Sequence, residues 1–216
     1  DVVRQMIARY PDVFVYADTA ATAEAAMKRG KIASLIGMEG GHSIGSSLEI
    51  LRQMHALGAR YMTITHSLTT DWADSATDAP KHDGLSPFGF EVIAEMNRLG
   101  MIVDLSHVSE ATMHDVLDKG KAPVLFTHSN ARAVTPHPRN VPDSVLKRLP
   151  QNGGVVMVTF VPGFTSPERR QWEYDRSAVA GRAKLEFTGN PAGEKAVVDA
   201  WIAAHPQPKA TLLQVA

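Results

Sequence analysis

The sequence predicts an α/β fold with a parallel sheet, and three observations support this. Five unbroken apolar runs alternate along the chain with segments of helical periodicity. Strands of a parallel sheet are buried on both faces, so unbroken apolar runs are typical of them. Four of the runs are followed within two residues by Glu or His. Because parallel strands end at one rim of a sheet, we expect these four side chains to meet there, as in part of a (β/α)8 barrel.

The first of these strand ends carries a glutamate. After an alanine-rich helix over about residues 19–29, the run Ile32–Met38 is predicted to be a buried strand. Glu39 closes it and is followed by Gly40 and Gly41, which allow close approach of the backbone. A carboxylate in that place suits a metal-bridging ligand. A solvated glutamate in a turn explains this stretch equally well.

The second strand end carries His66. A helix is predicted over residues 47–57, followed by the strand Arg60–Thr65 and then directly by His66. The polar loop Leu68–Gly84 comes next, before a helix over Pro87–Leu99 that begins with a serine cap and a proline. A loop of that length over a strand end is usually functional, so we expect it to form a substrate-facing lid.

The next two strand ends carry one histidine each. The strand Met101–Leu105 leads to His107, and the strand over residues 122–126 leads to His128, with a helix over 109–120 between them. One histidine after a strand is most often an ordinary loop or core residue. Two imidazoles at the same rim on successive strands can share a metal ion.

Beyond His128 the pattern continues for one more unit. An exposed loop contains Arg132 and Arg139, a short helix begins near Asn140 and ends near Leu149, and Gly154–Phe160 is predicted to be the fifth buried strand. No strand is followed by a Gly-rich phosphate motif or a Walker lysine, which disfavours a nucleotide-binding sheet.

The remaining segment is read as an addition to the barrel. Residues 161–210 are charged and rich in proline, with a helical piece over Glu194–Ala204, and we expect this segment to pack on the outside of the barrel or over its rim. Thr211 and Gln214 form a capping-box start for a further helix. Residues 1–216 are therefore predicted to form a single barrel domain.

Composition limits the classes of function. Hydrophobic residues make up 44% and charged residues 21% of the 216 residues, as in globular proteins. The net charge of −1 gives no indication of a nucleic-acid partner. No apolar run reaches the roughly 20 residues of a membrane span. The chain has no cysteine, so a metal must be held by His, Asp and Glu.

Several motifs in order resemble one family. These are EGGHS at Glu39, THS at His66, GLSPFG at 84–89, DLSHVS at His107 and THS at His128. Together they resemble the membrane (renal) dipeptidase family, which comprises zinc-dependent hydrolases on an amidohydrolase-type barrel. The resemblance covers about residues 1–160 and resumes at Ala210. It implies a TIM-type metal-dependent hydrolase that cleaves dipeptides with water activated by two zinc ions.

The resemblance also assigns roles to individual residues. It implies that Glu39 bridges two zinc ions and that His107 and His128 bind one of them. It implies that His66 contacts the substrate and steadies the developing oxyanion. It further implies that Arg139 holds the substrate carboxylate, which agrees with the bidentate capture of carboxylates by guanidinium groups.

Two family motifs are not covered by this chain. A His-x-Asp at the end of the first strand is expected upstream of Asp1, and a Gly-Gly-Asp with the proton-shuttling aspartate is expected beyond Ala216. The chain therefore resembles an internal fragment of a bacterial-type member, a barrel lacking its first and last strands. As a separate polypeptide it is expected to be inactive.

Other interpretations stay open at this point. The chain is also compatible with another binuclear barrel hydrolase acting on amides or lactams, or with a catalytically dead barrel used as a binding domain. The sequence leaves open the metal loaded, the side-chain preference, the compartment (bacterial cytoplasm or periplasm) and the oligomeric state, a homodimer among the alternatives. Four further histidines are expected at the surface: His82, His114, His137 and His205.

Overall fold

The computed structural model describes residues 2–211, which divide into two compact units. Within the described range, the first unit consists of residues 2–126 and 148–155, and the second of residues 127–147 and 156–211. The helix predicted to start at Thr211 falls mostly on residues outside the described range. No helix of the described chain is long and apolar enough to cross a membrane.

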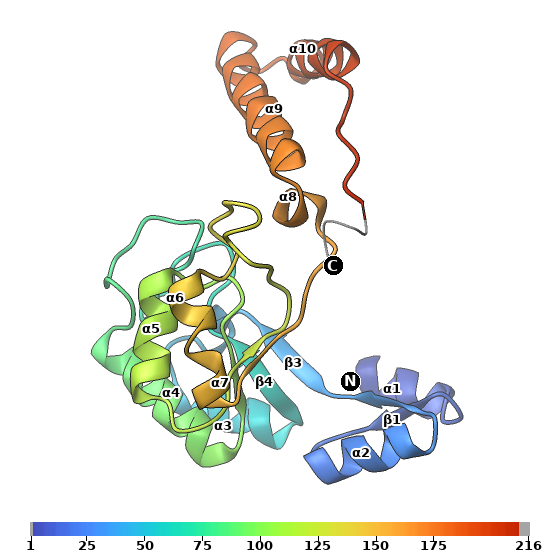
Figure 1. The fold of residues 1–216 in the computed structure, drawn as a ribbon, viewed down its shortest axis with the longest axis vertical. Coiled ribbons are helices and arrows are strands. Elements are labelled where there is room, and N and C mark those ends of the chain that lie inside the picture. Colours follow the sequence, from blue (N-terminus) through green and yellow to red (C-terminus); the bar gives the residue numbers. More distant parts are fainter. Residues whose placement is uncertain (1, 212–216) are drawn as a thin grey trace. The chain divides into compact units, whose positions relative to one another are not determined.

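A five-stranded sheet forms the centre of the first unit (Figure 1). Its strands lie in chain order: β3 (Ile36–Glu39), β4 (Ala59–Thr63), β5 (Ile102–Asp104), β6 (Leu125–Phe126) and β7 (Val155–Val156). The pairs from β3 to β6 are parallel. This confirms the predicted α/β fold with a parallel sheet, and a sequential strand order is that of part of a (β/α)8 barrel.

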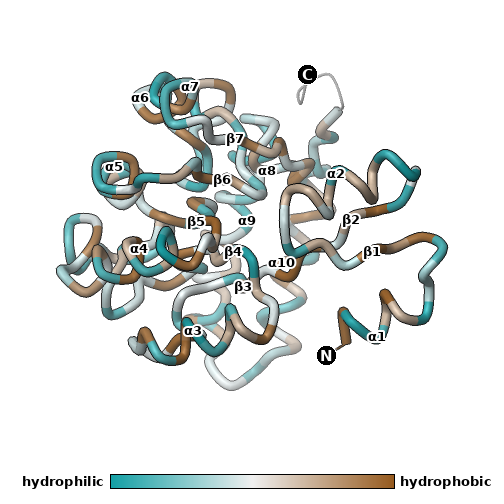
Figure 2. The backbone as a smooth tube through the Cα atoms, turned by 90° about the horizontal axis from the view of Figure 1, so that it is seen from below, coloured by the Kyte–Doolittle hydropathy of each residue, from teal (hydrophilic) through white to brown (hydrophobic). Residues whose placement is uncertain are grey.

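Three helices link the strands and lie along the outer side of the curved sheet (Figure 2). They are α3 (Leu48–Ala56), α4 (Pro87–Leu99) and α5 (Glu110–Lys119). Each begins at a serine whose hydroxyl accepts a backbone N–H in the first turn, which satisfies an otherwise unpaired donor. Their apolar faces and the outward faces of the strands form the buried core, which includes Met62, Ile93, Met96, Val103 and Val116.

The pairing register of β3, β4 and β5 places the carboxyl ends of these strands at one level of the sheet. Glu39 on β3 pairs with Thr63 on β4, and Thr63 pairs with Asp104 on β5. Residues paired across neighbouring strands point to the same face, so these three side chains share the inner face of the sheet. The residues that follow them, among them His66 and His107, therefore leave the sheet at neighbouring points.

The predicted strand Ile32–Met38 is divided between two sheets. β2 (Ile32–Ser34) pairs in parallel with β1 (Phe14–Tyr16), and only β3 joins the five-stranded sheet. The run was expected to be buried, but Ile32 is 54% and Leu35 is 40% exposed. An apolar run is buried along its whole length only where all of it forms one strand of a single sheet. The small sheet is completed by α1 (Val2–Arg9) and α2 (Ala20–Lys28).

Two further predictions near the end of the sheet were wrong in extent. The helix expected over residues 140–149 is two short helices, α6 (Asp143–Leu146) and α7 (Leu149–Asn152), because Pro150 has no N–H to continue the first one. The fifth strand contains only Val155 and Val156, and the apolar residues around it are about half exposed. Within the described chain β7 is an edge strand, so only one side of it is paired.

Helices dominate the second unit. They are α6, α8 (Pro162–Thr165), α9 (Pro167–Glu186) and α10 (Pro191–Ala204). The 20-residue helix α9 was not predicted, because its charged sequence shows little apolar periodicity. It packs on α10 through Trp172 and Trp201, whose ring centroids lie 5.5 Å apart. Trp172 Nε1 donates to the carbonyl of His205, 2.8 Å away.

Candidate metal centre

Glu39 is placed by the two glycines that follow it. Gly40 has φ +117°, a backbone conformation that residues with a side chain rarely adopt. Gly41 donates its N–H to the carbonyl of Ile64, and a Cβ there would lie 2.4 Å from that oxygen and 2.4 Å from Trp72 Cζ2. The chain can therefore turn sharply against the end of β4 only with glycine at these positions. The turn leaves the Glu39 carboxylate half exposed at the end of β3.

His107 has a left-handed backbone with φ 74°, which is unusual for a non-glycine residue. Its carbonyl oxygen accepts the N–H of Ala76 at 2.7 Å and is 3.3 Å from Ser75 Oγ. Ser75 Oγ also donates to the carbonyl of His66 at 2.7 Å. The buried hydroxyl of Ser75 thus ties the chain after β4 to the chain after β5. A single serine in a long loop carries no sequence signal for this role, and the sequence analysis missed it.

The two tied histidines lie beside the glutamate. Their rings are stacked, with centroids 4.2 Å apart and an interplanar angle of 26°. Glu39 Oε1 is 3.4 Å from His107 Nε2 and 3.9 Å from His66 Nε2. The side chain of His107 is 11% exposed and that of His66 is 45% exposed. The buried imidazole therefore faces the carboxylate, and the other imidazole remains open to a small molecule.

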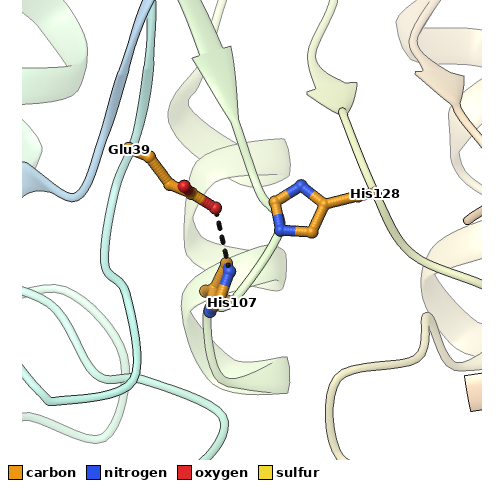
Figure 3. Close-up of side chains that lie close together, drawn as sticks. All are labelled: Glu39, His107 and His128. Atoms are coloured by element: carbon orange, nitrogen blue, oxygen red, sulfur yellow. Dashed lines mark ion pairs between the residues drawn. The ribbon is translucent and has the colours of Figure 1, made fainter. Parts of the chain in front are cut away.

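Glu39, His107 and His128 each offer one ligand atom, and these atoms lie within 4.8 Å of one another (Figure 3). Donor atoms that share one zinc ion at bonds of about 2.0–2.2 Å lie about 3.5 Å apart, so small side-chain rotations would close the set. One carboxylate oxygen and two imidazole nitrogens are ligands that zinc accepts. The residues present therefore fit a zinc ion.

Buried polar groups support the strand ends from inside the sheet. Asp104 is fully buried, accepts the Thr63 hydroxyl at 2.6 Å and accepts the N–H of Ser106 at 3.0 Å. Tyr61 fills the space that Gly37 leaves open. Burial raises the pKa of the Tyr61 phenol, and the carboxylates of Asp104 and Glu39 raise it further. The inner face of the sheet therefore carries two carboxyl groups and a phenol at the strand ends.

A cavity of about 720 Å³ opens beside His66. The predicted loop Leu68–Gly84 forms much of its wall through residues up to Trp72. That volume is in the range of small-molecule sites. The open histidine is therefore next to a space that a substrate side chain could occupy.

The loop is held by one buried carboxylate. Asp74 accepts backbone N–H groups from Lys81, His82 and Gly84 at 2.8–3.2 Å. Burial alone would raise the pKa of Asp74, but these three N–H groups and the nearby His82 outweigh it and lower the pKa. The loop expected to form a lid is thus held in place by hydrogen bonds to Asp74, whereas the sequence predicted only where the loop lies.

Arg139 lies in the second unit and is buried there, with 4% of its surface exposed. Its backbone N–H donates to His137 Nδ1 at 3.0 Å, and its guanidinium lies 5.3 Å from the ring centre of Phe164. Asn140, the next residue, donates to the carbonyls of Thr135 and Phe164. The backbone and side chain of Arg139 are therefore held by a small, well-packed cluster.

Three of the four histidines expected at the surface are less exposed than predicted. His137 is half-buried, and burial lowers its pKa to about 4, assisted by Arg170 and Arg139. His82 and His114 are also half-buried, and they contact the Thr70 carbonyl and Arg148 respectively. Only His205 is exposed as predicted. Short-range sequence patterns do not register the contacts of His82 and His114, because their partners are 12 and 34 residues away.

Comparison with solved structures supports the same fold. The chain is similar to the probable dipeptidase PvdM from Pseudomonas aeruginosa, with TM-score 0.82 and 24% identity, covering 99% of this chain and 60% of that one. It is similar to the dipeptidase AC, a metallopeptidase of family M19, with TM-score 0.66 and 33% identity, covering 71% and 47%. A metallopeptidase from Rhodobacter sphaeroides liganded with a phosphinate mimic of L-Ala-D-Ala matches with TM-score 0.65 and 28% identity, covering 94% and 65%.

The chain spans between 47% and 65% of the lengths of these three structures. The sequence profile of the membrane dipeptidase family, peptidase family M19, matches residues 1–216. The resemblance noted in the motifs therefore extends over the whole chain. This chain belongs to the membrane dipeptidase family.

Proposed function

We propose that the full-length protein hydrolyses the peptide bond of dipeptides, with zinc held by Glu39, His107 and His128. The observation that carries the proposal is the convergence of one carboxylate and two imidazoles from three strand ends within 4.8 Å. Membership of a metallopeptidase family and likeness to a structure with a bound dipeptide mimic support it. Since the chain spans only part of its relatives, the activity is proposed for the longer protein.

A zinc ion in this site would contribute to the chemistry of hydrolysis in two ways. Zinc bound in such a set lowers the pKa of water towards 7 and polarises a carbonyl oxygen. The carboxylate of Glu39 supplies one negative charge, which offsets half of the charge of a divalent cation. The contact between His107 and Glu39 orients both groups before any ion enters.

His66 is proposed to act on the substrate. Its ring is half exposed, beside Glu39 and at the edge of the cavity. An N–H at that point can donate to a carbonyl oxygen as negative charge develops on it. The stack on His107 and the Ser75 hydrogen bond to its backbone limit the positions that its ring can take.

Arg139 is proposed to bind the free carboxylate of the dipeptide. A guanidinium can hold a carboxylate through two parallel hydrogen bonds. A peptide with a blocked C-terminus has no carboxylate there and cannot accept them. Its backbone and ring contacts hold the group in one orientation, which reduces the entropy lost on binding.

The test uses the full-length protein. Zinc content is measured by elemental analysis, and hydrolysis is measured on a dipeptide panel that includes D-residues at the second position. Glu39→Gln should lose zinc and activity together. Glu91→Gln, an exposed position on α4, is the matched control and should retain both. Full activity in Glu39→Gln, or a zinc-loaded wild type that cleaves no dipeptide, would overturn the proposal.

A further inference from the structure

The cavity beside His66 contains one unpaired anion. Among the described residues that line it, Asp71 is the only ionisable side chain apart from His42 and His66. Within residues 2–211, no hydrogen bond or ion pair engages the Asp71 carboxylate. The other residues of the wall are serine, threonine, glycine, leucine and tryptophan, which carry no charge. The electrostatic character of the wall is therefore set by Asp71.

Asp71 is presented by a fixed turn. The N–H of Thr70 donates to the carbonyl of Ala73 at 3.0 Å, and the Thr70 hydroxyl oxygen accepts the N–H of Ala73 at 3.0 Å. His82 Nε2 lies 3.2 Å from the Thr70 carbonyl. The turn is thus closed on itself and tied to the far end of the loop. Asp71 occupies the exposed position within the turn, so its backbone needs little ordering when a cation arrives.

Apolar surface lines the same cavity. Leu68 is in its wall and is 70% exposed. Trp72 is also in the wall, but only 1% of its surface is exposed, so Leu68 supplies the apolar area. A side chain with an aliphatic stem and a cationic end can cover apolar surface with the stem while its end stays near an anion and water. Lysine and arginine have this construction.

We propose that Asp71 makes the protein select dipeptides that carry a lysine or arginine side chain, placed in the cavity beside His66. This inference rests on the proposed dipeptidase function. Acidic side chains would meet the Asp71 carboxylate without a compensating cation, and they are selected against. Neutral side chains of the same length keep only the apolar contact.

The experiment compares kcat/KM for matched dipeptides on the full-length, metal-loaded protein. Lysine is compared with norleucine, which keeps the aliphatic stem without the charge, and with glutamate, at the first and at the second position. We expect lysine to exceed norleucine by about fivefold at one position, as an ion pair with an exposed carboxylate allows. The preference should shrink as salt rises. Binding of phosphinate analogues with lysine or norleucine side chains gives a second readout that requires no turnover.

Two variants and one control decide the outcome. Asp71→Asn should reduce the lysine-to-norleucine ratio to within about twofold, and Asp71→Lys should favour glutamate over lysine. Asp83→Asn, outside the cavity and in a left-handed conformation that Asn tolerates, should leave the ratio unchanged. If dipeptides are cleaved with no lysine preference, or with one that Asp71→Asn retains, this inference fails alone. If no dipeptide is cleaved, the proposed function fails. The inference then stands only if the lysine phosphinate analogue binds more tightly than the norleucine analogue and Asp71→Asn removes that difference. Equal binding of the two analogues would make the inference fail as well.

Discussion

The imidazole rings of His66 and His107 are stacked with their centroids 4.2 Å apart, although 41 residues separate them in the chain. They follow adjacent strands of the parallel sheet, β4 and β5. The same serine hydroxyl, from Ser75, contacts the backbone carbonyls of both. One histidine faces Glu39 from a buried position and the other borders the cavity. This pairing joins the proposed metal centre to the proposed substrate site, and it leads to the first prediction.

Removing the hydroxyl of Ser75 should weaken zinc binding without removing a ligand. In Ser75→Ala the left-handed backbone of His107 keeps the bond from the Ala76 N–H but loses the hydroxyl. Groups that orient metal ligands typically affect affinity by about 10- to 100-fold. Zinc affinity is measured by competition with a chelator. Ser43→Ala, at an exposed serine, is the control. Equal zinc affinity in the two variants would show that the Ser75 hydroxyl does not orient the metal ligands.

Replacing His66 should slow turnover while zinc stays bound. His66→Ala should lower kcat by about 10²–10³, because a donor to the developing oxyanion is lost. His66→Gln, which keeps a donor, should retain more activity. Steady-state kinetics and zinc stoichiometry are measured on the same preparations. Loss of zinc from His66→Ala would show that this residue is a ligand instead.

Replacing Arg139 should weaken the binding of free carboxylates. A contact that is equally strong in the ground state and the transition state affects KM more than kcat. Arg139→Ala should therefore raise KM for a dipeptide strongly and hardly change that for the corresponding dipeptide amide. Arg182→Ala, exposed on α9, serves as the control. A fall in kcat with unchanged KM would contradict the assigned role.

Acid should remove a contribution to stability made by Glu95 on α4. Hydrogen bonds from Arg98 and then Arg52 lower its pKa from 4.5 to about 2, and the contact with Arg52 joins α4 to α3. Because the folded state holds the proton less tightly than the unfolded state, this stability is complete above about pH 4.5 and disappears as pH falls towards 2. Both arginines are substantially exposed, so solvent screening keeps the contribution small.

The measurement is urea unfolding of wild type and Glu95→Gln between pH 7 and pH 2.5. The variant should be less stable at pH 7, and the difference should narrow below pH 4.5. Glu91→Gln, on the same helix but exposed, should show no such dependence. A difference that stays constant across this range would mean that the ion pairs do not contribute.

The fold class and the positions of the strand ends follow from local patterns in the sequence. Apolar runs specify parallel strands because both faces of such strands are buried, and a polar residue directly after a run must then lie at the rim. For this reason Glu39, His66, His107 and His128 could be named before their positions were known. Serine caps and terminal glycines likewise specified α4 to the residue, because these signals act within one helical turn.

The tertiary structure decided everything that depends on a distant partner. The run after Ile32 divides between two sheets because β1 competes for its first half, which no local pattern reveals. The helix α9 follows from proline and serine at its start, the ion pair between Arg169 and Glu173, and packing on α10, not from apolar periodicity. Ser75 and Asp71 acquire their proposed roles only because the loop between β4 and α4 returns to the strand ends. Hydrogen bonds and charges act through space, so their partners become visible only when the chain has folded.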